Sequence, residues 1–368
     1  MGHGHGLSME TAYHLLSALT LLGTLIPLLP FQHWTVRGLD FAKIQIFILQ
    51  IVLLIGGAVS PVEISHFLQW QLALAAGALY NGVTLARFTR WWPITPVEVV
   101  EQHSDEVSLL SANVYQFNTH YHRFIAQVRA TDPDIVLTME SNEDWDTAMK
   151  ELEGDYPYRC KVPLENTYGM HLYSKLEMTT QVHYFVADDL PSIEAHVRTR
   201  NGYKFVLFGV HPPPPSPTEE PNSKERDGEL LSVAKKIRND GKTTVVIGDF
   251  NNVAWARSSQ LFRKTSHTID PRIGRAMCCT FHAHYRFLRV PIDQIYHTSD
   301  VFVQELGTLP EFGSDHLALY CRFFINRLDD SQEERLEHLE SGEMEEVNEM
   351  IEEGIAEESD REEVVTED

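Results

Sequence analysis

The sequence predicts an α/β domain with a mixed sheet, preceded by membrane-spanning helices and followed by an acidic tail. Three observations support this prediction. About 90 residues at the start are almost free of charge, short apolar strands alternate with helices in the middle, and acidic side chains dominate the last 40 or so. A chain of 368 residues has room for one domain of about 200–250 residues and additional segments.

Three N-terminal stretches contain no Asp, Glu, Lys or Arg, namely Thr11–Val36, Ile44–Val62 and Ile64–Ala86. About 20 helical residues are enough to cross the hydrocarbon core of a bilayer. We therefore predict three transmembrane helices in a membrane anchor of residues 1–92, followed by a linker of residues 93–106. The alternatives are buried helices of a soluble domain, or a cleaved signal peptide for the first stretch.

Beyond the linker, apolar runs typical of strands alternate with helical patterns, which places the catalytic domain at residues 107–328. The Asn201-Gly202 pair between two strand-like runs predicts a hairpin, so we expect antiparallel pairing within the sheet. The clearest predicted strands are Val107–Val114, Asp134–Thr138, Ala195–Thr199, Phe205–Val210, Thr243–Ile247, Ile292–Tyr296 and Leu317–Phe324, and the clearest helices are Tyr121–Ala130 and Glu229–Arg238.

Polar residues that can bind metal or transfer protons recur at the ends of these strands. Taken singly, each has an ordinary explanation as a turn, a helix cap or a solvated loop residue. Their order and their mixture of carboxylate, amide and imidazole groups indicate a functional site, because catalytic groups concentrate on loops held by rigid strands. The residues are Asn113, Glu140, His211, Asp249, Asn251, Asp293, Asp315 and His316.

Six short motifs resemble the endonuclease/exonuclease/phosphatase superfamily, which includes DNase I-like nucleases, abasic-site endonucleases, neutral sphingomyelinases and inositol polyphosphate phosphatases. They are Ser111–Tyr115, Asp134–Glu140, Gly169–Ser174, Gly248–Asn251, Ile292–Ile295 and Gly313–His316. The resemblance implies a DNase I-like four-layered α/β sandwich. Bacterial members with three N-terminal membrane helices look similar along nearly the whole chain up to residue 328.

The sequence departs from the family pattern at two places. Met139 precedes Glu140 where the family often has Gln, and His171 stands where small or apolar residues are common. Glu143 is a nearby alternative carboxylate for binding the metal, but it lies beyond the end of the strand. We therefore predict Glu140 as the metal-binding residue.

The resemblance implies a bound divalent metal, Mg²⁺ or Mn²⁺, and no organic cofactor. These hard cations prefer carboxylate, amide and water oxygens, and they neutralise the charge of a phosphoester during attack by water. By resemblance, Asn113, Glu140 and Asp315 form the metal-binding set.

The same resemblance implies roles for the remaining residues. Asp249 aligns or deprotonates the attacking water, or holds a second metal. Asn251 donates to the phosphoryl oxygen as charge develops there. Asp293 orients His316, which contacts the scissile phosphate, and His211 is a candidate acid near the leaving group. The sequence leaves open which histidine is the acid and which the base.

Phosphoester hydrolysis is therefore the predicted function, with a nuclease and a lipid or small-molecule phosphodiesterase or phosphatase both left open. No long basic run marks a nucleic-acid surface. The alternative is a non-catalytic membrane protein that uses the fold as a binding module. The predicted partners are a phosphoester substrate and the lipid bilayer, and no protein partner is inferred.

Two arguments on orientation in the bacterial cytoplasmic membrane disagree. Arg37 and Lys43 follow the first helix and Arg87 and Arg90 follow the third, so the positive-inside rule places the catalytic domain in the cytoplasm. Resemblance to the three-helix bacterial relatives places it outside, and we adopt this orientation.

The acidic tail spans residues 329–368. Residues 327–368 contain 19 acidic and 3 basic side chains. Such a run usually self-repels and stays extended, so we expect a solvated tail. Leu336, Leu339, Val347 and Ile351 recur at helical spacing, which leaves a thin amphipathic helix as the alternative.

Overall fold

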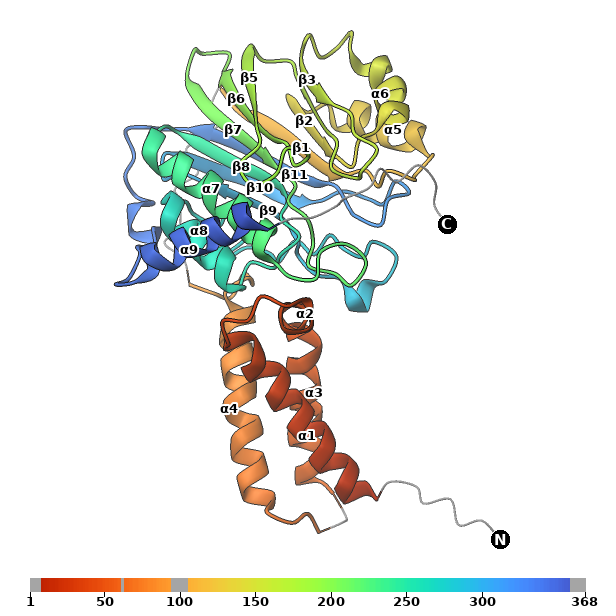
Figure 1. The fold of residues 1–368 in the computed structure, drawn as a ribbon, viewed down its shortest axis with the longest axis vertical. Coiled ribbons are helices and arrows are strands. Elements are labelled where there is room, and N and C mark those ends of the chain that lie inside the picture. Colours follow the sequence, from red (N-terminus) through yellow and green to blue (C-terminus); the bar gives the residue numbers. More distant parts are fainter. Residues whose placement is uncertain (1–7, 61–62, 94–104, 358–368) are drawn as a thin grey trace.

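The computed structural model describes residues 8–60, 63–93 and 105–357. A bundle of helices extends from one end of a two-sheet α/β sandwich (Figure 1). Most of the predicted linker, together with residues 1–7 and 358–368, lies outside the described residues.

The bundle consists of α1 (Met9–Leu25), α2 (Trp34–Phe41), α3 (Lys43–Ala58) and α4 (Phe67–Ala86). Within residues 8–60 and 63–93, one helical segment, Met9–Leu28, is long and apolar enough to cross a membrane. A second qualifies if α2 and α3, whose axes differ by 66°, count as one bent span. Length and hydropathy therefore do not support the prediction of three spanning helices, because α3 alone is short and α4 contains polar residues.

The first sheet has the order β10-β11-β1-β2-β4-β3. Strands β1 and β2 are parallel, and the other neighbours are antiparallel. Its strands are β1 (Val107–Asn113), β2 (Ile135–Met139), β3 (Tyr158–Val162), β4 (Met170–Ser174), β10 (Val301–Thr308) and β11 (Leu319–Ile325).

The second sheet has the order β5-β6-β7-β8-β9, and in it β7 and β8 form the parallel pair. The predicted hairpin at Asn201-Gly202 is confirmed as the antiparallel pair β6–β7. The strands are β5 (Met178–His183), β6 (Ser192–Arg198), β7 (Lys204–Val210), β8 (Thr244–Asp249) and β9 (Asp293–His297).

Three apolar cores join four layers of helices and sheets. The first core lies between the two sheets and contains Leu109, Leu207 and Ile247. The second packs the first sheet against α5 (Tyr121–Thr131) and α6 (Glu143–Met149). The third packs the second sheet against α7 (Lys224–Asp240) and α8 (Arg257–Ser266). The arrangement is the layered α/β sandwich that the sequence predicts.

The bundle is docked on the sandwich through an apolar cluster and specific hydrogen bonds. Phe41, Leu85 and Phe88 of the bundle pack with Trp255 and Ile292 of the sandwich. The buried Trp255 indole donates to the Asp40 carbonyl at 2.8 Å. Because buried aromatic contacts with a satisfied indole N–H are strong anchors, the two parts share one interface rather than only a covalent link.

The acidic tail is held against the sandwich, contrary to the favoured expectation of a solvated chain. Helix α9 (Glu343–Ala356) buries Val347 against Leu231 of α7 and Leu261 of α8. Its acidic face meets a basic partner, since Arg257 donates to Glu343 at 2.8 Å. The amphipathic alternative therefore describes residues 343–356, because neighbouring cations offset the self-repulsion that the sequence suggests.

Candidate active site

All eight predicted residues meet at the edge of the sandwich that faces the bundle. The parallel pairs β1–β2 and β7–β8 both end there, and β9 begins there, with Asp249 paired to Asp293 in the ladder. A cavity of about 480 Å³ opens at this edge. It is lined by Glu140, His211, Asp249, Asn251, Asp315 and His316, while Asn113 and Asp293 lie behind them in contact with this group.

The Asn113 amide joins carboxylates from the two sheets. Its Nδ2 donates to Glu140 Oε1 at 2.7 Å and to Asp249 Oδ2 at 3.1 Å. Its Oδ1 accepts from the Tyr115 backbone N–H at 3.0 Å. Because both ends of the amide are occupied, Asn113 orients the two carboxylates in this arrangement.

Glu140 lies half-buried beside a second carboxylate, that of Asp315. Burial and the negative charge of Asp315 raise the pKa of Glu140 to about 7, against the opposing hydrogen bond from Asn113. The Gln116 backbone N–H donates to Glu140 Oε2 at 3.1 Å. Ionised Glu140 is therefore costly here unless a cation compensates it.

Asp293 and His316 form a hydrogen-bonded pair next to Asp249. His316 Nδ1 lies 2.8 Å from Asp293 Oδ2, and its Nε2 lies 3.6 Å from Asp249 Oδ2. Burial alone would lower the pKa of His316, but the charges of Asp293 and Asp249 outweigh it and raise this pKa to about 10. The imidazole is therefore held as a cation with a fixed orientation.

His211 lies on the other side of Asp249 in a different electrostatic state. Its Nε2 is 3.9 Å from Asp249 Oδ2, too far for a hydrogen bond, and its buried Nδ1 has no partner among the described residues. Burial lowers the pKa of His211 to about 4, although Asp249 opposes this. One histidine is thus charged and the other neutral across a shared carboxylate.

The close approach of strand β7 explains why Gly precedes Asp249 at the end of β8. Gly248 has a φ of 155°, and a Cβ there would lie 2.0 Å from the Val210 carbonyl oxygen of the neighbouring strand. Glu140 and Asn251 also have left-handed backbones, with φ values of 58° and 47°. Such strain in non-glycine residues is typical of functional loops that are held by their surroundings.

Asn251 is held by hydrogen bonds at its side-chain amide nitrogen and at its backbone carbonyl. Its Nδ2 donates to the Pro212 carbonyl at 2.9 Å, and its own carbonyl accepts from the buried Arg226 at 3.1 Å. One hydrogen of the Asn251 amide is therefore engaged, and the second is available to another acceptor.

The cavity also includes residues that the sequence analysis did not select. Gly38 and Phe41 of α2 form part of its wall, although α2 belongs to the bundle. The Tyr168 ring lies 5.4 Å from the His211 ring, and the Phe281 ring lies 4.9 Å from the His316 ring. No local pattern marks these positions, because their role depends on how distant segments are brought together.

The two departures from the family pattern, Met139 and His171, do not line the cavity, and neither does the alternative carboxylate Glu143. Met139 is buried in the core between the two sheets. His171 is fully buried in β4, and both its ring nitrogens lack partners among the described residues. Burial lowers the pKa of His171 to about 4. Glu143 is exposed at the start of α6.

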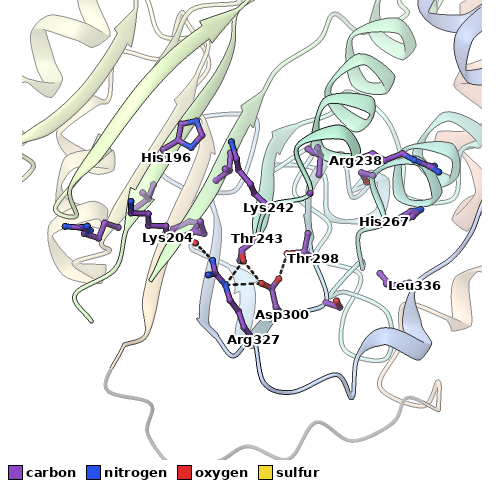
Figure 2. A pocket seen from close by; sticks show the side chains of 18 of the residues that line it. His196, Lys204, Arg238, Lys242, Thr243, His267, Thr298, Asp300, Arg327 and Leu336 are labelled. Atoms are coloured by element: carbon purple, nitrogen blue, oxygen red, sulfur yellow. Dashed lines mark hydrogen bonds and ion pairs between the residues drawn. The ribbon is translucent and has the colours of Figure 1, made fainter. Parts of the chain in front are cut away.

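A larger cavity of about 1140 Å³ lies at the opposite end of β8 and contains none of the eight residues. Figure 2 shows basic side chains around it, including Lys204, Lys242 and Arg327. The Arg327 Nε lies 3.7 Å from the Asp300 carboxylate and forms an ion pair with it. Size alone therefore does not identify the active site.

Two groups of residues are candidates for a metal. Ligand atoms of Asp249, Asp293 and His316 lie within 4.8 Å of one another. A cation among them would face the positive charge on His316 and compete for its hydrogen bond. Glu140 and Asp315 instead place two carboxylates together, and this excess of negative charge fits a divalent cation.

The fold and this carboxylate-rich cavity at the strand ends define a class of two-sheet sandwich proteins with a polar site on one edge. The family model described as "Endonuclease/Exonuclease/phosphatase family" matches residues 110–316, more than half of the chain. The chain therefore belongs to the endonuclease/exonuclease/phosphatase family. No curated protein matches it.

Solved structures share the sandwich. They include humanized Danio rerio (D. rerio) TDP2 with 14 mutations, at 17% identity and a TM-score of 0.51 over 60% of this chain and 100% of that one. An endonuclease/exonuclease/phosphatase family protein from Bacteroides thetaiotaomicron has 18% sequence identity and a TM-score of 0.51, over 61% of this chain and 100% of that one. The human Nocturnin catalytic domain with bound sulfate has 14% sequence identity and a TM-score of 0.51, over 60% of this chain and 95% of that one. At these identities the likeness shows the fold.

The pairing of Asp293 with His316 makes a testable prediction. In metal-free protein, Asp293→Asn should lower the His316 titration midpoint by at least about one pH unit, because it removes a negative charge that favours the imidazolium. Imidazole NMR signals, assigned by comparison with His316→Ala, would measure this. Asp300→Asn, which changes a carboxylate at the far end of β8, should leave the midpoint in place. Equal His316 midpoints in the wild type, Asp293→Asn and Asp300→Asn would contradict the pairing.

Proposed function

We propose that this chain is a divalent-metal-dependent phosphoesterase. The observation that carries the proposal is the Asn113 amide, which joins Glu140 and Asp249 beside the Asp293–His316 pair in one cavity. Metal-binding, water-activating and proton-transferring groups thus lie within reach of one bound phosphate. Both phosphodiesters and phosphomonoesters fit this chemistry.

Glu140 and Asp315 would hold the metal, with Asn113 fixing the orientation of Glu140. When bound, the cation would neutralise charge on the phosphoryl group and on the departing oxygen. Asn113 acts as a positioning residue in this proposal, since its own amide oxygen already accepts from Tyr115. The predicted direct contact of Asn113 with the metal would require its side chain to rotate.

The remaining residues would carry out the proton transfers of hydrolysis. A P–O bond to water forms, the P–O bond to the alcohol breaks, and a proton moves from the water to the leaving oxygen. Burial raises the pKa of Asp249, although the His316 charge opposes this, so Asp249 is suited to accept a proton from water. Charged His316 would contact the phosphate, and Asn251 would donate its second amide hydrogen to the phosphoryl oxygen.

His211 has the opposite character to His316 and suits a different part of the substrate. It is neutral, buried and without a hydrogen-bond partner at Nδ1 among the described residues. A neutral imidazole can donate one hydrogen bond and accept another. We therefore place it beside the leaving oxygen, where it would stabilise the developing alcohol.

We also propose that α1, α3 and α4 anchor the protein in a membrane. Their outer faces carry large exposed apolar side chains, such as Leu19 (54% exposed), Ile55 (61%) and Leu79 (69%). The polar side chains lie inside, where Asn81 donates to Thr24 at 2.9 Å and to Gln50 at 3.0 Å. Apolar outside and polar inside is the arrangement favoured in lipid, and it accounts for the low hydropathy of α4.

The activity is tested by removing the metal-binding carboxylate. Glu140→Gln should reduce kcat by at least about 100-fold, because it removes charge needed at the transition state. The assay would use full-length protein in dodecyl maltoside, Mg²⁺ and bis-p-nitrophenyl and p-nitrophenyl phosphates, and chelation should abolish turnover. Glu143→Gln, an exposed carboxylate nearby, should retain activity. Wild-type protein inactive on every phosphoester would favour the binding module instead.

The orientation is tested in intact bacterial cells. Three helices with the N-terminus inside place the catalytic domain outside the cytoplasmic membrane. Protease added after permeabilisation of any outer membrane should therefore digest the chain beyond Trp92. A cytoplasmic protein of the same cells, probed in parallel, should stay intact. Protection of the domain until the inner membrane is lysed would reverse the proposed orientation.

A further inference from the structure

The active-site cavity is built partly by the membrane bundle. Gly38 and Phe41 of α2 line it together with Glu140 and His316. Helix α3 begins at Lys43, two residues after Phe41. If α3 enters the bilayer, this wall of the cavity lies at the height of the lipid headgroups. Figure 1 shows α2 at the end of the bundle that meets the sandwich.

A loop on the same side connects the cavity to an exposed apolar tip. Phe281 and Val290 pair at its base, and Phe281 lines the cavity. At its tip, Phe287 is 95% exposed and Leu288 is 60% exposed. The Phe287 carbonyl accepts from Gln45 in the first turn of α3 at 3.1 Å. The tip is thus held beside the point where α3 starts.

Large apolar side chains at such a position fit the interfacial region of a bilayer better than water. The short helix α2 is bent 66° from α3, so it does not continue the direction of the bundle. Helix α2 and the base of the loop thus line the cavity, and the tip of the loop lies beside the start of the membrane anchor helix α3.

The lining of the cavity further limits the substrate. Its acidic residues are Glu140, Glu219, Asp249 and Asp315, and much of the rest is aromatic or proline. Among the described residues that line it there is no Lys or Arg. Binding of nucleic acid depends chiefly on such cations contacting successive phosphates, so this cavity suits a substrate with a single phosphate group and an apolar portion.

We infer that the substrate is a lipid phosphoester that reaches the cavity from the bilayer, with its phosphate at the active site and its chains in the membrane. This inference rests on the proposed phosphoesterase activity and membrane anchor. Helix α2 and residues 281–290 would form the entrance. A bilayer lipid carries its phosphate in the headgroup layer, so it would enter without leaving the membrane entirely.

The test compares lipids with their deacylated counterparts, using full-length protein in dodecyl maltoside micelles with Mg²⁺. The pairs are phosphatidylglycerol with glycerophosphoglycerol, and phosphatidic acid with glycerol 3-phosphate; a single-stranded oligonucleotide is the third class. At least one lipid should exceed its counterpart in kcat/KM by about 10-fold or more, since burying two methylenes is already worth this much. The oligonucleotide should be the poorer substrate.

The double variant Phe287→Asp/Leu288→Asp tests the entrance. It should lower the lipid-to-deacylated ratio of kcat/KM by about 10-fold. Leu328, which is 98% exposed beyond β11, provides the matched control, and Leu328→Asp should leave this ratio in place. The double variant and the control replace only exposed side chains, so we expect both proteins to fold as the wild type does.

Three results would overturn the inference. They are equal kcat/KM values for lipid and deacylated esters, preference for the oligonucleotide, or equal loss on both esters in the loop variant. Turnover of soluble esters without lipid preference would leave the phosphoesterase standing and remove only the lipid substrate. Absence of turnover on every ester would remove both.

Discussion

Crowding of carboxylates is the constraint on which the site depends. Buried Asp249 and Asp293 converge with half-buried Glu140 and Asp315 in a cavity where water solvates their charges only in part. Hydrogen bonds from Asn113 and the charge of His316 offset part of this cost, yet the pKa of Glu140 still rises to about 7. In the proposed function a divalent cation would supply the remaining compensation, held by Glu140 and Asp315 close to the groups proposed to activate water and transfer protons.

The sandwich makes this crowding possible because the two sheets end at the same edge. Parallel pairs place Asn113 beside Glu140 in one sheet and His211 beside Asp249 in the other. The bundle then forms one wall of the opening through Gly38 and Phe41, and it is fixed to the sandwich by packing of Phe88 on Trp255. The docking of the bundle therefore also shapes the candidate active site.

Much of this could be predicted from local sequence. Asp249 follows a buried apolar strand and a glycine, so both its position and the strained turn are locally encoded, and the α/β sandwich follows from similar strands. Strand β5 was not predicted, because its central residues are exposed and it contains no apolar run. The role of Phe41 and the docking of α9 had no local signal, because both depend on contacts with residues that are distant in the sequence.

The most direct test of the account is Mn²⁺ binding to the full-length protein in dodecyl maltoside, measured by the EPR signal of free Mn²⁺. If Glu140 and Asp315 hold the ion, Glu140→Gln should weaken binding by at least about 10-fold, since a charged oxygen ligand is lost. Asp293→Asn should not weaken it, because His316 then carries less charge. Loss of binding in Asp293→Asn with retention in Glu140→Gln would place the ion among Asp249, Asp293 and His316 and contradict the account.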